Sequence, residues 1–148
     1  MKTLYLKLTD ITGKAKDTSL LLLRLILAYG FFKPALMKWK DINGIAEWFA
    51  SMDYPLPLLN AYMAASTEIL LAILLPLGLF TRLISVPGMI TMVVAITTVH
   101  LRNGFEASAN GFEIPLYYLL MLFVLFTHGP GMYSMDNLWL EKRGKQNI

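Results

Sequence analysis

Glu68 is the residue in the sequence that most clearly suggests chemistry, because it is a carboxylate in the middle of the apolar run YMAASTEILLAILL at residues 62–75. Its helical neighbours are small or apolar: Ala61, Ala64, Ala65, Leu71, Ala72 and Leu75. Small residues allow close helix packing, and a carboxylate facing lipid near mid-bilayer costs several kcal/mol. We therefore expect Glu68 to point into a helical bundle, either protonated or paired with a cation.

Two cations on the first apolar run, Arg24 and Lys33, are the candidate partners of Glu68. With a helical rise of about 1.5 Å per residue, Lys33 lies near the depth of Glu68, whereas Arg24 lies close to the inner edge. An ideal helix places the two cations on opposite faces, and Arg24 has the face that suits the bundle interior. Lys33 is favoured by depth and Arg24 by face, so both remain candidates.

A second polar group is expected where the third and fourth apolar runs meet. His100 ends one run, Glu113 opens the next, and Tyr117 follows one turn later. Antiparallel packing through a short link predicts that the three side chains face one another. Such a group can form a proton relay, a quinone headgroup site or a polar substrate site, or can simply lie among lipid headgroups.

Several kinds of chemistry are excluded by composition. The chain has no cysteine, which rules out disulfide exchange and cysteine-ligated cofactors. Its two histidines, His100 and His128, fall at opposite ends of the predicted bundle, so we expect no metal site. The net charge of +3 is explained by membrane orientation and predicts no nucleic-acid partner. No residue pattern assigns an enzymatic reaction to the chain.

The elements that position these residues are four apolar stretches near the length that crosses a bilayer. They run over about 20–37, 58–79, 83–101 and 113–128, in a chain of 148 residues of which 56% are hydrophobic. Barrel strands would alternate apolar and polar residues, and these stretches do not. The sequence predicts an all-α polytopic membrane protein, a single domain over 1–148 built as an antiparallel four-helix transmembrane bundle.

A short interfacial helix is expected at about 43–53, in the first outer loop. Ile45, Trp48, Phe49 and Met52 repeat at the spacing of one helix face, and tryptophan suits the headgroup level. This helix either anchors the loop or covers an opening in the bundle; anchoring is the favoured interpretation.

The distribution of Lys and Arg predicts the orientation, with both termini in the cytoplasm. Eight positive residues fall on the predicted cytoplasmic side: Lys2, Lys7, Lys14, Lys16, Arg82, Lys142, Arg143 and Lys145. The opposite side has Lys38, Lys40 and Arg102, and also Lys33 if it reaches outward.

Four pieces of sequence, in this order, resemble the DoxX family of small four-span bacterial membrane proteins. They are LLLRLILAYGFFKPALMKW, STEILLAILLPLGLFTR, ITTVHLRNGF and GPGMYSMD. The segments AEWFASMDYPLP and TRLISVPGMITMVVAITTVHLRNGFEA look closest to HvfX-like members, which are encoded beside genes for copper-related modified peptides. The resemblance implies a location in a bacterial inner membrane. The family takes its name from a thiosulfate:quinone oxidoreductase, other members are tied to oxidative-stress complexes, and related four-span proteins include a eukaryotic cargo receptor.

Three functions are consistent with these residues. The first is a quinone- or lipid-binding membrane subunit of a redox or stress system, whose polar interior is formed by Arg24, Lys33, Glu68, His100, Glu113 and Tyr117. The second is a small transporter or export partner for a peptide or metabolite. The third is a structural partner whose buried charges fix helix register. Expected partners are membrane lipid, redox or secretion proteins, and a second copy of the chain, since four short spans bury little surface. A quinone is the cofactor compatible with the first function.

Overall fold

The computed structural model describes the backbone of residues 2–139, and side chains from residue 12 onward except at position 14. Six positive residues used above to predict orientation have side chains outside the described residues: Lys2, Lys7, Lys14, Lys142, Arg143 and Lys145.

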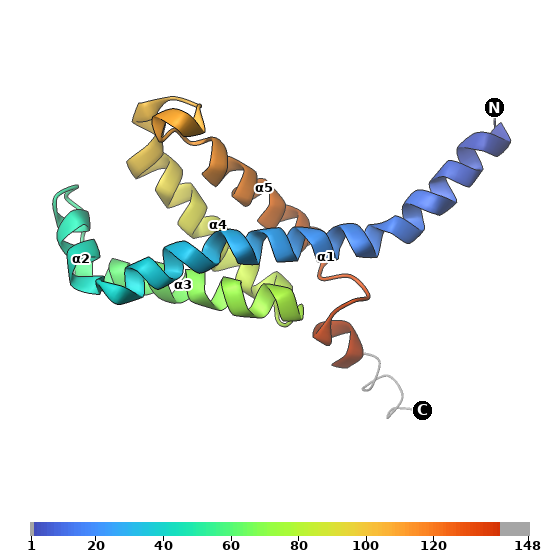
Figure 1. Cartoon of the computed structure of the whole chain (residues 1–148), viewed down its shortest axis with the longest axis horizontal. Helices are drawn as coiled ribbons and strands as arrows, with labels where there is room; N and C mark the ends of the chain where they lie inside the picture. The colour runs from blue at the N-terminus through green and yellow to red at the C-terminus, as the bar shows by residue number, and fades with distance from the viewer. Residues whose placement is uncertain (1, 140–148) are drawn as a thin grey trace.

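Over the described residues, five α-helices form the fold (Figure 1). The helices α1 (Lys2–Lys40), α3 (Pro57–Leu77), α4 (Thr81–Ala95) and α5 (Glu113–His128) carry the apolar runs. A π-helical turn, η1 (Ile96–His100), and a 3₁₀ turn, η2 (Leu101–Asn103), extend α4, and η3 (Ala107–Ala109) lies in the loop before α5. A short helix, α2 (Ile42–Ala50), is present where the interfacial helix was predicted, and it begins where Asp41 accepts a 2.9 Å hydrogen bond from the Gly44 amide.

The helices pack as two antiparallel pairs. In the first pair α1 lies along α3, and α2 packs on the start of α3; in the second pair α4 lies along α5. Figure 1 shows the two pairs crossing near the middle of α1 and diverging toward the end that carries α2 and the loop between α4 and α5. We call these pairs the two arms, and their diverging end the α2 end.

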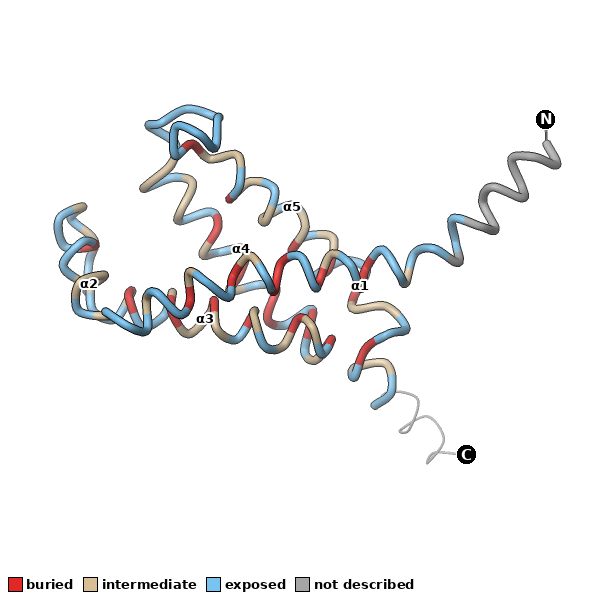
Figure 2. Tube along the Cα trace, viewed as in Figure 1, coloured by how far each residue is buried: buried red, intermediate tan, exposed pale blue. Residues whose placement is uncertain are grey.

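The core lies where the arms meet (Figure 2). The buried apolar residues come from all four long helices and include Leu27, Phe31, Leu71, Leu75 and Leu122. Gly88 allows close packing here, because a Cβ at this position would be only 3.0 Å from Leu71 and 3.1 Å from Leu122. The arms are therefore joined by a tightly packed apolar centre.

The end opposite α2 is closed by Arg24, which is completely buried. Its guanidinium donates to the carbonyl of Leu75 at 3.3 Å and to that of Tyr133, in the segment after α5. Asp136 of that segment accepts hydrogen bonds from the amides of Phe80 and Thr81, at 2.8 and 3.0 Å. The segment after α5 is thereby fastened to the turn between α3 and α4.

The predicted fold class is confirmed: the described chain is helical, without strands. Within the part of the chain that the structure describes, three helical segments are long and apolar enough to cross a membrane, Ala15–Lys40, Pro57–Leu77 and Thr81–Asn103, and α5 is a shorter apolar helix of 16 residues. The lipid-exposed surface of such a bundle explains why many large apolar side chains, such as Leu83 and Ile90, are exposed.

Candidate functional site

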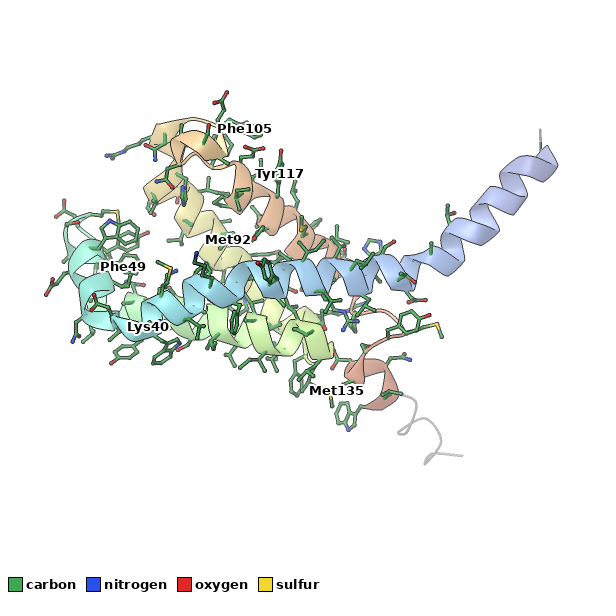
Figure 3. All side chains as sticks on the ribbon, in the orientation of Figure 1. Lys40, Phe49, Met92, Phe105, Tyr117 and Met135 are labelled. Atoms are coloured by element: carbon green, nitrogen blue, oxygen red, sulfur yellow. The ribbon has the colours of Figure 1, made fainter. Side chains whose placement is uncertain are left out.

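A pocket of about 240 Å³ lies between the arms at the α2 end. Its wall is mostly apolar and is built by α1, α2, α3, α4, η1 and α5 together. Figure 3 shows Phe49 on α2 and Met92 on α4, which line opposite parts of this space. We call it the inter-arm pocket.

The polar centre of the pocket wall is an ion pair between Lys38 and Glu68. The Lys38 Nζ donates to Glu68 Oε1 at 3.0 Å and to Oε2 at 2.8 Å. The Glu68 side chain is 7% exposed and that of Lys38 is 19% exposed. An ammonium group has three N–H donors, so this geometry leaves one of them for a ligand.

His100 contributes a second polar group to the pocket wall. Its Nδ1 lies 2.8 Å from the carbonyl oxygen of Asn110. Because a carbonyl only accepts hydrogen bonds, the proton of the neutral ring belongs on Nδ1, and Nε2 is then an acceptor. The pocket wall thus offers an N–H donor from α1 and a ring acceptor from η1.

Aromatic side chains cover the pocket at the α2 end. Phe49 stacks on Tyr54 with ring centroids 5.0 Å apart, and Trp48 lies 5.4 Å from Phe49. The Tyr54 hydroxyl donates to Thr98 Oγ1 at 2.5 Å, which joins the loop after α2 to η1 on the other arm. Helix α2 therefore covers one side of the pocket, which is the less favoured of the two roles predicted for it.

A fourth aromatic residue, Tyr118, closes the pocket between α1 and α5. Its ring packs edge-on against Phe31 at 5.3 Å and fits against Gly30, where a Cβ would collide with the Tyr118 hydroxyl. Gly30 is therefore required for this contact between the two arms.

The partner predicted for Glu68 was wrong. Glu68 is buried as expected, but its cation is Lys38 rather than Lys33 or Arg24. Lys33 is exposed on the outer face of α1, and Arg24 donates to the Leu75 carbonyl at the closed end of the bundle. The physical reason is that α1 continues as a helix to Lys40, which places Lys38 inside the bundle.

Among the described side chains, His100 forms its hydrogen bond with the Asn110 carbonyl and none with Glu113 or Tyr117, the residues predicted to face it. Glu113 accepts from the Tyr117 hydroxyl at 3.1 Å and from the Ala107 amide at 3.0 Å. Figure 3 shows Tyr117 near Phe105, by the loop between α4 and α5. Glu113 and Tyr117 hold this loop, while His100 lines the pocket.

Of the six residues expected in the polar interior, Glu68 and His100 line the inter-arm pocket. Lys38 and Tyr118 were missed. A signal for Lys38 exists in the sequence, because Phe31, Ala35 and Lys38 follow the spacing of one helix face. In the described part of the chain, no group of three or more acidic or histidine side chains could hold a metal ion.

The sequence profile of the DoxX family matches residues 19–101, more than half of the chain. The chain belongs to the DoxX family. The match includes Arg24, Lys38 and Glu68 and ends just after His100. The protein is accordingly a membrane protein with transmembrane helices.

Curated relatives of this DoxX-family chain come from several bacteria. An uncharacterized protein of Haemophilus influenzae is 34% identical over 130 residues, covering 85% of this chain and 86% of the relative. The Bacillus subtilis protein named "Putative oxidoreductase CatD" is 35% identical over 110 residues, covering 74% and 77%. The inner membrane protein YphA of Escherichia coli is 34% identical over 74 residues, covering 50% and 53%. No solved structure is significantly similar to the chain.

Proposed function

We propose that the protein is a quinone-binding membrane subunit of a redox system, and that the inter-arm pocket receives the quinone ring. The observation that carries the proposal is the Lys38–Glu68 ion pair, set in the wall of a mostly apolar, aromatic-covered pocket. A buried ion pair contributes little net stability compared with apolar packing. Stability alone therefore does not explain the pair, whereas hydrogen bonding to a ligand does.

The chemistry of the wall suits a quinone ring. A quinone carbonyl accepts the third N–H of Lys38, while a quinol hydroxyl donates to Nε2 of His100. The apolar wall and the rings of Trp48 and Phe49 cover the flat faces. The volume of about 240 Å³ is somewhat below the usual range for ligand pockets and fits a single ring better than a folded peptide.

Two further points support a redox subunit over an export path. The relative CatD bears an oxidoreductase name. A path through the bundle would have to cross the packing of Gly88 on Leu71 and the junction closed by Arg24. In this proposal the electrons are supplied by a partner protein, and the chain holds the quinone in the bilayer.

The test is a titration of the purified protein in lipid nanodiscs with a short-chain benzoquinone, followed by saturable quenching of tryptophan fluorescence. Trp48 lines the pocket, so binding quenches it, and Trp48→Phe removes that quenching. The pair variant Lys38→Met/Glu68→Gln, which leaves no uncompensated charge, is expected to weaken binding by about tenfold or more.

The matched control is Lys33→Met, which removes a lysine from the exposed face of the same helix and should leave the titration unchanged. An alcohol with the same chain but no ring should not compete. Equal affinity in the pair variant and the wild type would exclude this site for the quinone.

A further inference from the structure

A groove of about 160 Å³ opens between α3 and α4 next to the inter-arm pocket. Five residues form walls of both hollows, so the two adjoin: Phe49, Tyr54, Ala64, Thr91 and Val94. The groove continues past Thr67 on α3 and Pro87 on α4. Its outer residues, Met63 and Ile90, are 58% and 59% exposed on the side of the bundle that faces lipid. We call it the α3–α4 groove.

We propose that the α3–α4 groove holds the hydrocarbon tail of the ligand whose ring occupies the inter-arm pocket, so that the tail leaves sideways into the bilayer. This inference rests on the proposed function. It identifies the ligand as a membrane-resident, tailed quinone rather than a water-soluble one.

The surface of the groove suits a hydrocarbon chain. Three of its polar residues form hydrogen bonds within the protein: Thr91 Oγ1 donates to the Pro87 carbonyl at 2.9 Å, and Asn60 donates to the Pro55 carbonyl at 2.5 Å. The Tyr54 hydroxyl donates to Thr98. The groove therefore presents mainly apolar atoms to a hydrocarbon chain.

Among the described residues, the opposite side of the pocket suits a hydrocarbon tail less well. Between α1 and α5 the Tyr118 ring is set against Gly30 and Phe31 and fills the contact between the arms. The hollow on that side is lined by α1 alone and carries the ammonium of Lys33, which a hydrocarbon tail would have to cover. Deeper in the bundle, the packing of Gly88 against Leu71 ends the space between α3 and α4.

The experiment uses a benzoquinone whose tail carries a diazirine close to the ring. The full-length protein in nanodiscs is irradiated, and the labelled residues are mapped by mass spectrometry with and without excess unlabelled tailed quinone. We expect competed labelling at groove residues of α3 and α4, such as Met63 and Ile90. Thr67→Phe, which fills the groove but does not line the pocket, should lower it by about tenfold or more.

The matched control is Leu70→Phe, which adds the same ring to the exposed face of α3 and should leave labelling unchanged. A tailless benzoquinone should still quench Trp48 in Thr67→Phe as in the wild type. Competed labelling on α1 or α5 would overturn the inference while leaving the proposed function in place. Labelling that excess quinone does not compete would mean ordinary lipid contact, which also overturns it. Failure of the wild type to bind tailless quinone would remove the proposed function itself.

Discussion

The ammonium of Lys38 lies 2.8 Å from Glu68 Oε2 and joins the last turn of α1 to the middle of α3. Both residues line the inter-arm pocket, near the point where the arms diverge. Arg24 occupies the same face of α1 about four turns away, because fourteen residues return a helix nearly to its starting direction. One face of α1 thus places a cation at each end of the bundle. Lys38 pairs with Glu68 in the pocket wall, and Arg24 binds carbonyl groups at the closed end.

The first prediction concerns the energy of the Lys38–Glu68 pair. Lys38→Met leaves a buried carboxylate without its cation, which costs about 3–5 kcal/mol. Adding Glu68→Gln should recover part of this loss, with a coupling energy of about 0.5–3 kcal/mol. Thermal unfolding in detergent measures the double-mutant cycle. The parallel cycle of Glu68→Gln with Lys33→Met should be additive; coupling to Lys33 instead of Lys38 would refute the assigned pair.

The second prediction concerns the closed end of the bundle. Gly78 has φ of +64°, and a Cβ there would collide with the Arg24 guanidinium and lie 2.5 Å from the Ser134 Cβ. Gly78→Ala should therefore destabilise the fold by about 2–5 kcal/mol through backbone strain and overpacking. Gly13→Ala is the control, since nothing lies within 4 Å of its Cβ, and it should gain about 0.5–1 kcal/mol of helix stability. Equal melting temperatures for the two variants would contradict the packing described for Arg24.

The third prediction distinguishes the buried arginine from an exposed one. Arg24→Lys keeps the charge but loses the planar fork that reaches the carbonyls of Leu75 and Tyr133, so it should cost about 1–3 kcal/mol. Arg82→Lys changes an exposed side chain at the start of α4 and should stay within about 0.5 kcal/mol of the wild type. Melting curves of both variants in the same detergent provide the comparison. If Arg24→Lys unfolds at the same temperature as the wild type, the closed end of the bundle does not depend on the guanidinium.

The sequence was sufficient to predict the long apolar helices and the inward position of Glu68, because the cost of exposing a carboxylate to lipid leaves few alternatives. It was not sufficient to predict the partner. The first apolar run was taken to end near Met37, which left Lys38 in a loop, whereas the helix continues to Lys40. Helix ends are set by local hydrogen bonds that hydropathy does not report. The separation of His100 from Glu113 depends on the loop of residues 101–112, whose contacts no periodicity encodes.

The fourth prediction is the orientation in the membrane, with the loop between α4 and α5 outside and both termini in the cytoplasm. The excess of Lys and Arg on one side supports it. Since the chain has no cysteine, Asn110→Cys and Lys16→Cys each create a single labelling site. In intact cells whose outer membrane has been permeabilised, a membrane-impermeant maleimide should label Asn110→Cys alone, and cell lysis should expose Lys16→Cys. The reverse pattern would invert the topology.

The most direct measurement of ligand binding by this site is solid-state NMR of the membrane-embedded protein with ¹⁵Nζ-labelled lysines and a ¹³C-carbonyl quinone. A hydrogen bond from Lys38 places its nitrogen within about 4 Å of the carbonyl carbon, close enough for a strong dipolar coupling. We expect that coupling in the wild type and in Lys33→Met, and its loss in Lys38→Met/Glu68→Gln. A wild-type protein without the coupling, or a pair variant that retains it, would contradict quinone binding at Lys38.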